Sequence, residues 1–181
     1  AECLPVHENA GAASFGLRMA HLKLAAPAVL AQGVVSSIIK NGVTPSNTAC
    51  NLTGGGTFSW LLAFDSVAGT LTTGGAKPAA NPALGYSFLN ESLPITGGTL
   101  PLNPVTLTAP LDAGCTTTSS AADLNLPIYL DVNAANAIAL PLRQARFSNI
   151  TVSGDHSCIG KYNAAGLSPA CNRAAYGAGC R

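Results

Sequence analysis

The chain has 181 residues, of which 48% are hydrophobic and 9% charged, and its formal net charge is +1. This composition excludes an intrinsically disordered chain, because disorder goes with low hydrophobicity and high charge. The nine basic residues are spread thinly, so nucleic-acid binding has no electrostatic support. The length suits one domain, and a surface so poor in charge is either solvated by Ser, Thr, Asn and Gly or partly buried in an assembly.

The cysteines point to an oxidising compartment. They are even in number, form no CxxC motif and span the chain: Cys3, Cys50, Cys115, Cys158, Cys171 and Cys180. Disulfides are the first expectation, and buried free thiols in a cytosolic protein are the alternative. Because three cysteines precede residue 120 and three follow it, complete pairing within the chain requires at least one bond between the two halves.

The first residues, AECLPVHENA, are typical of a mature N-terminus after removal of a signal peptide. The longest apolar stretch, residues 22–39, is interrupted by Lys23, Pro27 and Gln32, and it falls short of the roughly 20 apolar residues of a membrane span. We therefore expect a secreted or cell-surface protein without a transmembrane segment.

Residues 13–24 show the period of a strand. Phe15, Leu17 and Met19 alternate with Gly16, Arg18 and Ala20, and this alternation predicts a strand with one buried face.

Residues 27–42 show the period of a helix. Leu30, Val34 and Ile38 recur every four residues, Pro27 suits a first helical position, and Asn41-Gly42 is a typical stop. One short helix is predicted, with two short strands as the alternative because glycine and valine are mediocre helix formers.

A run of three glycines at residues 54–56 raises the question of phosphate binding. A phosphate-binding loop needs a Lys and a Ser or Thr directly after its last glycine, and then a helix. Here the next lysine is Lys77, and the residues of one parity after the glycines are bulky and apolar: Phe58, Trp60, Leu62 and Phe64. The segment therefore predicts a turn before a strand whose aromatic face points inward.

The rest of the chain continues the β pattern. Residues 64–75 predict a hairpin through the turn SVAG, and residues 126–142 repeat that arrangement. Residues 99–111 and 145–154 add alternating stretches, the first spaced by prolines that favour sheet edges. The expected long surface loops are residues 77–85 and 114–125.

These patterns predict roughly eight to ten short strands, with turns at the spacing of an antiparallel fold. The expected fold class is mainly β, a disulfide-stapled antiparallel sandwich or jelly roll with one short helix. Residues 1–162 are expected to form the single domain, and residues 163–181 a cysteine-bound tail packed on it.

The sequence gives little support to any set of catalytic residues. No G-x-S-x-G motif occurs, and a Ser-His-Asp triad would have to use His7, His21 or His156. His156 lies between Asp155 and Cys158, which favours a turn before a half-cystine over a catalytic histidine. Asp123 and Asp131 bracket a strand, so they are poorly placed for paired-carboxylate chemistry.

A hard cation such as calcium has one weak candidate site. Asp131, Asn133 and Asn136 lie in DVNAAN, and their oxygens are suitable ligands. The same residues favour hairpin tips merely because they tolerate turn geometry. No other metal and no cofactor is expected.

Glycan binding would use exposed aromatic side chains. The parity of Trp60 marks it as a core residue, which leaves Tyr129 and Tyr176 as candidate contacts, with Tyr86 and Tyr162 behind them. The sequons at Asn51, Asn90 and Asn149 occur about as often as chance predicts.

The sequence therefore favours a secreted, non-enzymatic structural or interaction protein whose partners are itself or other extracellular proteins. A carbohydrate-binding module is the second expectation. A secreted hydrolase with a site assembled from distant residues is the third.

Overall fold

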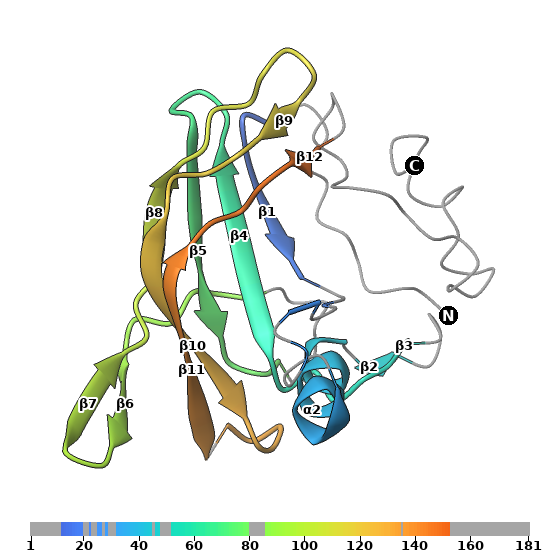
Figure 1. Ribbon diagram of the computed structural model, residues 1–181, viewed down its shortest axis with the longest axis vertical. Coiled ribbons are helices and arrows are strands. Elements are labelled where there is room, and N and C mark those ends of the chain that lie inside the picture. The colour runs from blue at the N-terminus through green and yellow to red at the C-terminus, as the bar shows by residue number, and fades with distance from the viewer. Residues whose placement is uncertain are drawn as a thin grey trace.

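A computed structural model describes residues 12–19, 22, 25–26, 28, 32–44, 46–47, 52–79, 86–134 and 136–152. This part of the chain is mainly β-structure with antiparallel pairing, and it includes the short helix α2 (Gly33–Val43) (Figure 1). The predicted β-rich class is confirmed at this level. The expected domain limit at residue 162 and the tail at 163–181 lie outside the described residues.

The central element is a four-stranded antiparallel sheet in the order β1-β4-β5-β8. Its strands are β1 (Ser14–Arg18), β4 (Ser59–Asp65), β5 (Thr70–Ala76) and β8 (Val105–Thr108). The predicted β4–β5 hairpin is confirmed. The Asp65 carboxylate closes its turn by accepting the backbone N–H groups of Val67 at 3.0 Å and Ala68 at 2.9 Å.

A second long hairpin joins β10 (Ala122–Tyr129) to β11 (Ala137–Ala145), as residues 126–142 predicted. The shorter pairs are β2 (Ser46–Asn47) with β3 (Leu52–Thr53), β6 (Ser92–Ile95) with β7 (Gly98–Pro101), and β9 (Thr116–Thr117) with β12 (Ile150–Thr151). Residues 114–125 are therefore not one long loop, because they contain β9 and the start of β10.

The aromatic row after the glycines points into the core, as predicted. Phe58 and Phe64 are buried, and Leu62 lies with Phe64 in one apolar cluster against Phe15 of β1. Trp60 packs against a second cluster, which joins Phe58 and β8 to α2 and the β10–β11 hairpin. Its indole nitrogen donates to Thr73 Oγ1 at 2.8 Å, so the polar edge of the ring is satisfied within the protein.

The buried face of α2 differs from the prediction. Val34 and Ile38, two of the three periodic positions, are exposed, while Ile39 and Val43 lie in the second cluster. The predicted stop at Asn41-Gly42 falls inside the helix, which ends at Val43. The four-residue spacing of apolar residues predicted the helix, but its contacts with β10 and β4 determine which face is buried.

Candidate functional site

The backbone of the glycine segment binds the end of α2. Gly55 N–H donates to the Asn41 carbonyl at 2.8 Å, and Gly56 N–H donates to the Thr44 carbonyl at 3.0 Å. Phe58 N–H donates to the Gly42 carbonyl at 2.9 Å. Helix ends leave their last carbonyls without intrahelical partners, and here the segment before β4 supplies the donors.

Gly54 brings this segment against the helix end. A Cβ atom at Gly54 would overlap the backbone carbonyl of Thr44, so only glycine allows the two chains to approach so closely. The amide groups of Gly55 and Gly56 that could have faced a phosphate are thus directed at protein carbonyls. The prediction that the glycines precede a strand and not a helix is confirmed, because β4 begins at Ser59.

Arg18 of β1 also binds the C-terminal end of α2. Its guanidinium donates to the Val43 carbonyl at 2.8 Å, to the Met19 carbonyl at 3.0 Å and to Ser59 Oγ at 3.1 and 3.2 Å. The group also lies 5.0 Å from the centre of the Tyr86 ring. Burial lowers the pKa of Arg18 from its ordinary value, and Tyr86 opposes that shift. These contacts tie β1 and β4 to α2, which is a structural role.

The predicted calcium residues form the tip of the β10–β11 hairpin. Asp131 Oδ1 accepts the backbone N–H of Asn133 at 2.8 Å, and Asn136 contributes its carbonyl to Leu130 N–H at 2.9 Å. The Asp131 carboxylate thus stabilises the turn, which is the alternative use of these residues. Among the described residues, no group of three or more His, Cys, Asp or Glu could hold a metal ion.

The candidate aromatic contacts have different outcomes. Tyr129 is 5% exposed and lies in a cluster with Leu89 and Leu102, so its ring offers little surface to a glycan. Burial raises the pKa of Tyr129 to about 12, with a smaller contribution from Glu91. Tyr176 lies outside the described residues.

Most of the other predicted sites lie outside the described ranges: Cys3, Cys50, Cys158, Cys171, Cys180, His7, His21, His156 and Asn51. Cys115 is half-buried against the first apolar cluster, and no disulfide is formed within the described part of the chain. Asn90 and Asn149 are both exposed. In the described ranges, no helix has the length and apolar character needed to cross a bilayer.

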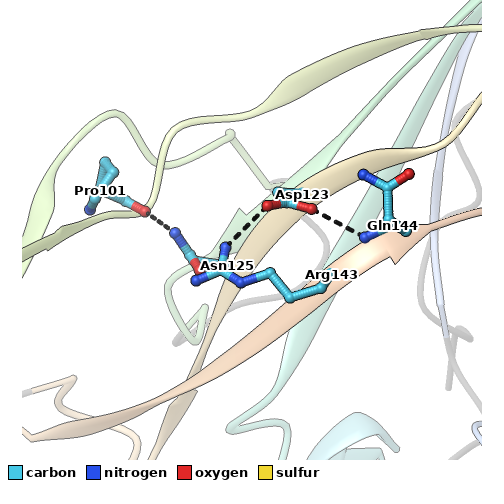
Figure 2. Close-up of polar contacts among 5 residues, drawn as sticks. All are labelled: Pro101, Asp123, Asn125, Arg143 and Gln144. Carbon is cyan, nitrogen blue, oxygen red and sulfur yellow. Dashed lines mark hydrogen bonds and ion pairs between the residues drawn. The ribbon is translucent and has the colours of Figure 1, made fainter.

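A polar cluster lies at the start of β10, where β11 carries an extra residue. Figure 2 shows the Asp123 carboxylate between two donors of β11, the Arg143 guanidinium at 3.4 Å and the Gln144 N–H at 2.9 Å. Asn125 Nδ2 reaches the Pro101 carbonyl at 3.0 Å on the other side (Figure 2). Asp123 therefore holds a β-bulge, at which Gln144 has a positive φ of 51°. Asp123 and Asp131 lie at opposite ends of β10, as expected.

The feature that sequence reasoning missed is the outer edge of β11. Within the described residues β11 pairs with β10 alone. Leu130 N–H donates to the Asn136 carbonyl, so Asn136 directs its backbone groups toward β10. Successive residues of an antiparallel strand direct their backbone groups alternately toward and away from the partner strand. The N–H groups of Ala137, Ala139 and Arg143 therefore point away from β10. Pro141 falls on the same outward parity, and its lack of an N–H was the signal in the sequence for an edge strand.

Comparison with known proteins adds no relative. No family model matches the chain, and neither a curated protein nor a solved structure is significantly similar to it.

Proposed function

We propose that the protein is a secreted, non-enzymatic structural or interaction subunit that associates with copies of itself. The observation that carries this proposal is a set of large apolar side chains left exposed on α2 and on the β10–β11 hairpin. These are Val34 (73% exposed), Ile38 (45%), Leu130 (62%), Val132 (63%) and Ile138 (48%).

The two elements are neighbours. Ile39 and Val43 of α2 pack in the same cluster as Ile128 of β10, and the tip of the hairpin lies beside α2 in Figure 1. Single exposed apolar residues are ordinary, but several on adjacent elements mark a contact surface. Lys40 and Asp131 supply the only charges on the helix and at the hairpin tip, so burial against a similar surface costs little desolvation.

The finer fold class belongs to the same proposal. We infer a sandwich or jelly-roll-like domain, because the four-stranded sheet and the β10–β11 hairpin both contribute side chains to one apolar cluster. We also infer disulfide staples, with at least one bond between the two halves. Mass mapping of the non-reduced protein tests this point: bonds confined within each half, together with free thiols, would contradict it.

Sedimentation velocity of the full chain over a wide concentration range tests self-association. We expect a concentration-dependent shift to larger species, and a monomer at every concentration would overturn the proposal. Leu130→Ser should weaken the association. Val67→Ser is the matched control, because Val67 is 84% exposed but lies in the β4–β5 turn, outside the proposed surface.

A further inference from the structure

The outer edge of β11, to which no described strand is paired, is suited to a specific partner. We propose that it pairs with the same edge of a second copy of this chain, antiparallel, with Leu140 directly opposite Leu140 of the second copy. This inference rests on the proposed self-association and adds the outer backbone edge of β11 to the apolar surface proposed above. The resulting four-stranded sheet would have the order β10-β11-β11-β10, with its second half from the second copy and a two-fold axis relating the two copies.

The hydrogen-bonding groups select this register. With Leu140 opposite itself, Ala137 faces Arg143 of the second copy, and the two residues exchange both of their backbone bonds. Ala139 faces Pro141 of the second copy and donates to its carbonyl. Every outward N–H group of β11 then has an acceptor.

The neighbouring registers form fewer backbone hydrogen bonds. If Pro141 lies opposite Pro141 of the second copy, neither residue has an N–H to give. If Ala139 lies opposite itself, Arg143 faces residue 135 of the second copy, which is beyond the end of β11. Proline on an edge strand usually limits pairing, and here it leaves one register in which every outward N–H group of β11 has an acceptor.

The side chains agree with that register. Ile138, Leu140 and Leu142 share the face that includes the second apolar cluster, and Ile138 is the most exposed of them. In the paired sheet Ile138 faces Leu142 of the second copy, so all the cross-strand pairs on this face are apolar. Such pairs stabilise a sheet more than Ala–Ala pairs do.

The charges do not oppose the pairing. Each Arg143 faces Ala137 of the second copy and keeps its own partner Asp123 at 3.4 Å. The two Arg143 residues lie six positions apart along the paired strands, roughly 20 Å at the rise of a β-strand. This separation exceeds the screening length at physiological ionic strength.

Cross-linking tests the register directly. Opposed residues of a non-hydrogen-bonded antiparallel pair are close enough for a disulfide. Oxidation of Leu140→Cys should therefore give a dimer in which peptide mapping shows the two positions 140 joined. Ile138→Cys is the control, because the two positions 138 would lie about 13 Å apart in this register. A bond between positions 138, or none between positions 140 in an associating protein, overturns the inference.

Two further variants change the number of outward N–H donors of β11 in opposite directions and leave its hydrogen bonds to β10 in place. Ala139→Pro removes an outward donor from each copy and should weaken the dimer roughly tenfold, whereas Pro141→Ala adds one and should strengthen it by a similar factor. Circular dichroism confirms folding, and sedimentation equilibrium measures the dimer. Unchanged association in both variants means that another surface is used, while the proposed function stands. A monomeric wild-type chain defeats both.

Discussion

The Arg18 guanidinium donates a hydrogen bond of 2.8 Å to the carbonyl of Val43, the last residue of α2. The bond joins two segments 25 positions apart in the chain. A cation at the C-terminal end of a helix also interacts favourably with the helix dipole. With the amide groups of the glycine segment, Arg18 supplies donors to the last turn of α2.

Arg18→Met should therefore destabilise the fold. The change removes donors from the Val43 carbonyl and from Ser59, which is 0% exposed, and unsatisfied buried acceptors cost about 1–3 kcal/mol. Urea unfolding measures the effect. Lys77→Met is the control, because Lys77 and Glu91 form an exposed ion pair expected to contribute under about 1 kcal/mol. Equal midpoints for the two variants would contradict this role of Arg18.

Gly75→Ala should disturb the contact between β5 and β10. A Cβ atom there would lie 2.5 Å from Pro127 Cδ, and both residues are buried, so one strand has to move. We expect a loss of stability of about 1–3 kcal/mol, typical of overpacking, measured as a lower thermal midpoint. Gly98→Ala serves as the control because no atom lies within 4 Å of its added Cβ. A destabilisation as large at Gly98 as at Gly75 would show that close packing is not the cause.

Thr73→Val should be detected by the single tryptophan. Thr73 is 1% exposed, accepts the Trp60 N–H at 2.8 Å and donates to the Leu61 carbonyl at 3.0 Å. The isosteric valine leaves the Trp60 N–H without its acceptor and removes one of the bonds to the Leu61 carbonyl, so we expect a cost of about 1–3 kcal/mol and an altered Trp60 emission spectrum. Thr72→Val is the control, because the Thr72 hydroxyl bonds to the Thr106 hydroxyl at the surface. An unchanged spectrum in Thr73→Val would argue against the buried bond.

Tyr129 should make the stability depend on alkaline pH. Burial raises its pKa to about 12, above the ordinary value of 10.0. Between these values the unfolded chain releases the phenol proton while the folded protein retains it, so the free energy of unfolding falls as the pH rises from 10 to 12. Below pH 10 the contribution is fully present.

Comparison with Tyr129→Phe isolates this effect from the other alkaline titrations. Denaturant unfolding at several pH values should show a shallower decline in the variant. Parallel declines in the variant and the wild type would show that the Tyr129 hydroxyl is not the source.

The alternation of apolar residues was sufficient to predict β1, the β4–β5 hairpin and the β10–β11 hairpin. It also placed Phe58 to Phe64 on an inward face, because strand parity is a local property. The buried side of α2 was missed, since Val34 and Ile39 are equally apolar and only contacts with distant strands distinguish them. Tyr129 was expected at the surface for a similar reason, because the residues that cover it, Leu89 and Leu102, are far away in the sequence.

The sequence by itself determined the β class, the turns and the conclusion that the glycine run precedes a strand, because these depend on neighbouring residues and backbone geometry. Tertiary structure alone decided that the glycine amides cap α2 and that β11 ends the described sheet with its outer edge open. Both depend on which distant segments meet, and hydrogen-bond partners across such distances leave no periodic signal in a single sequence.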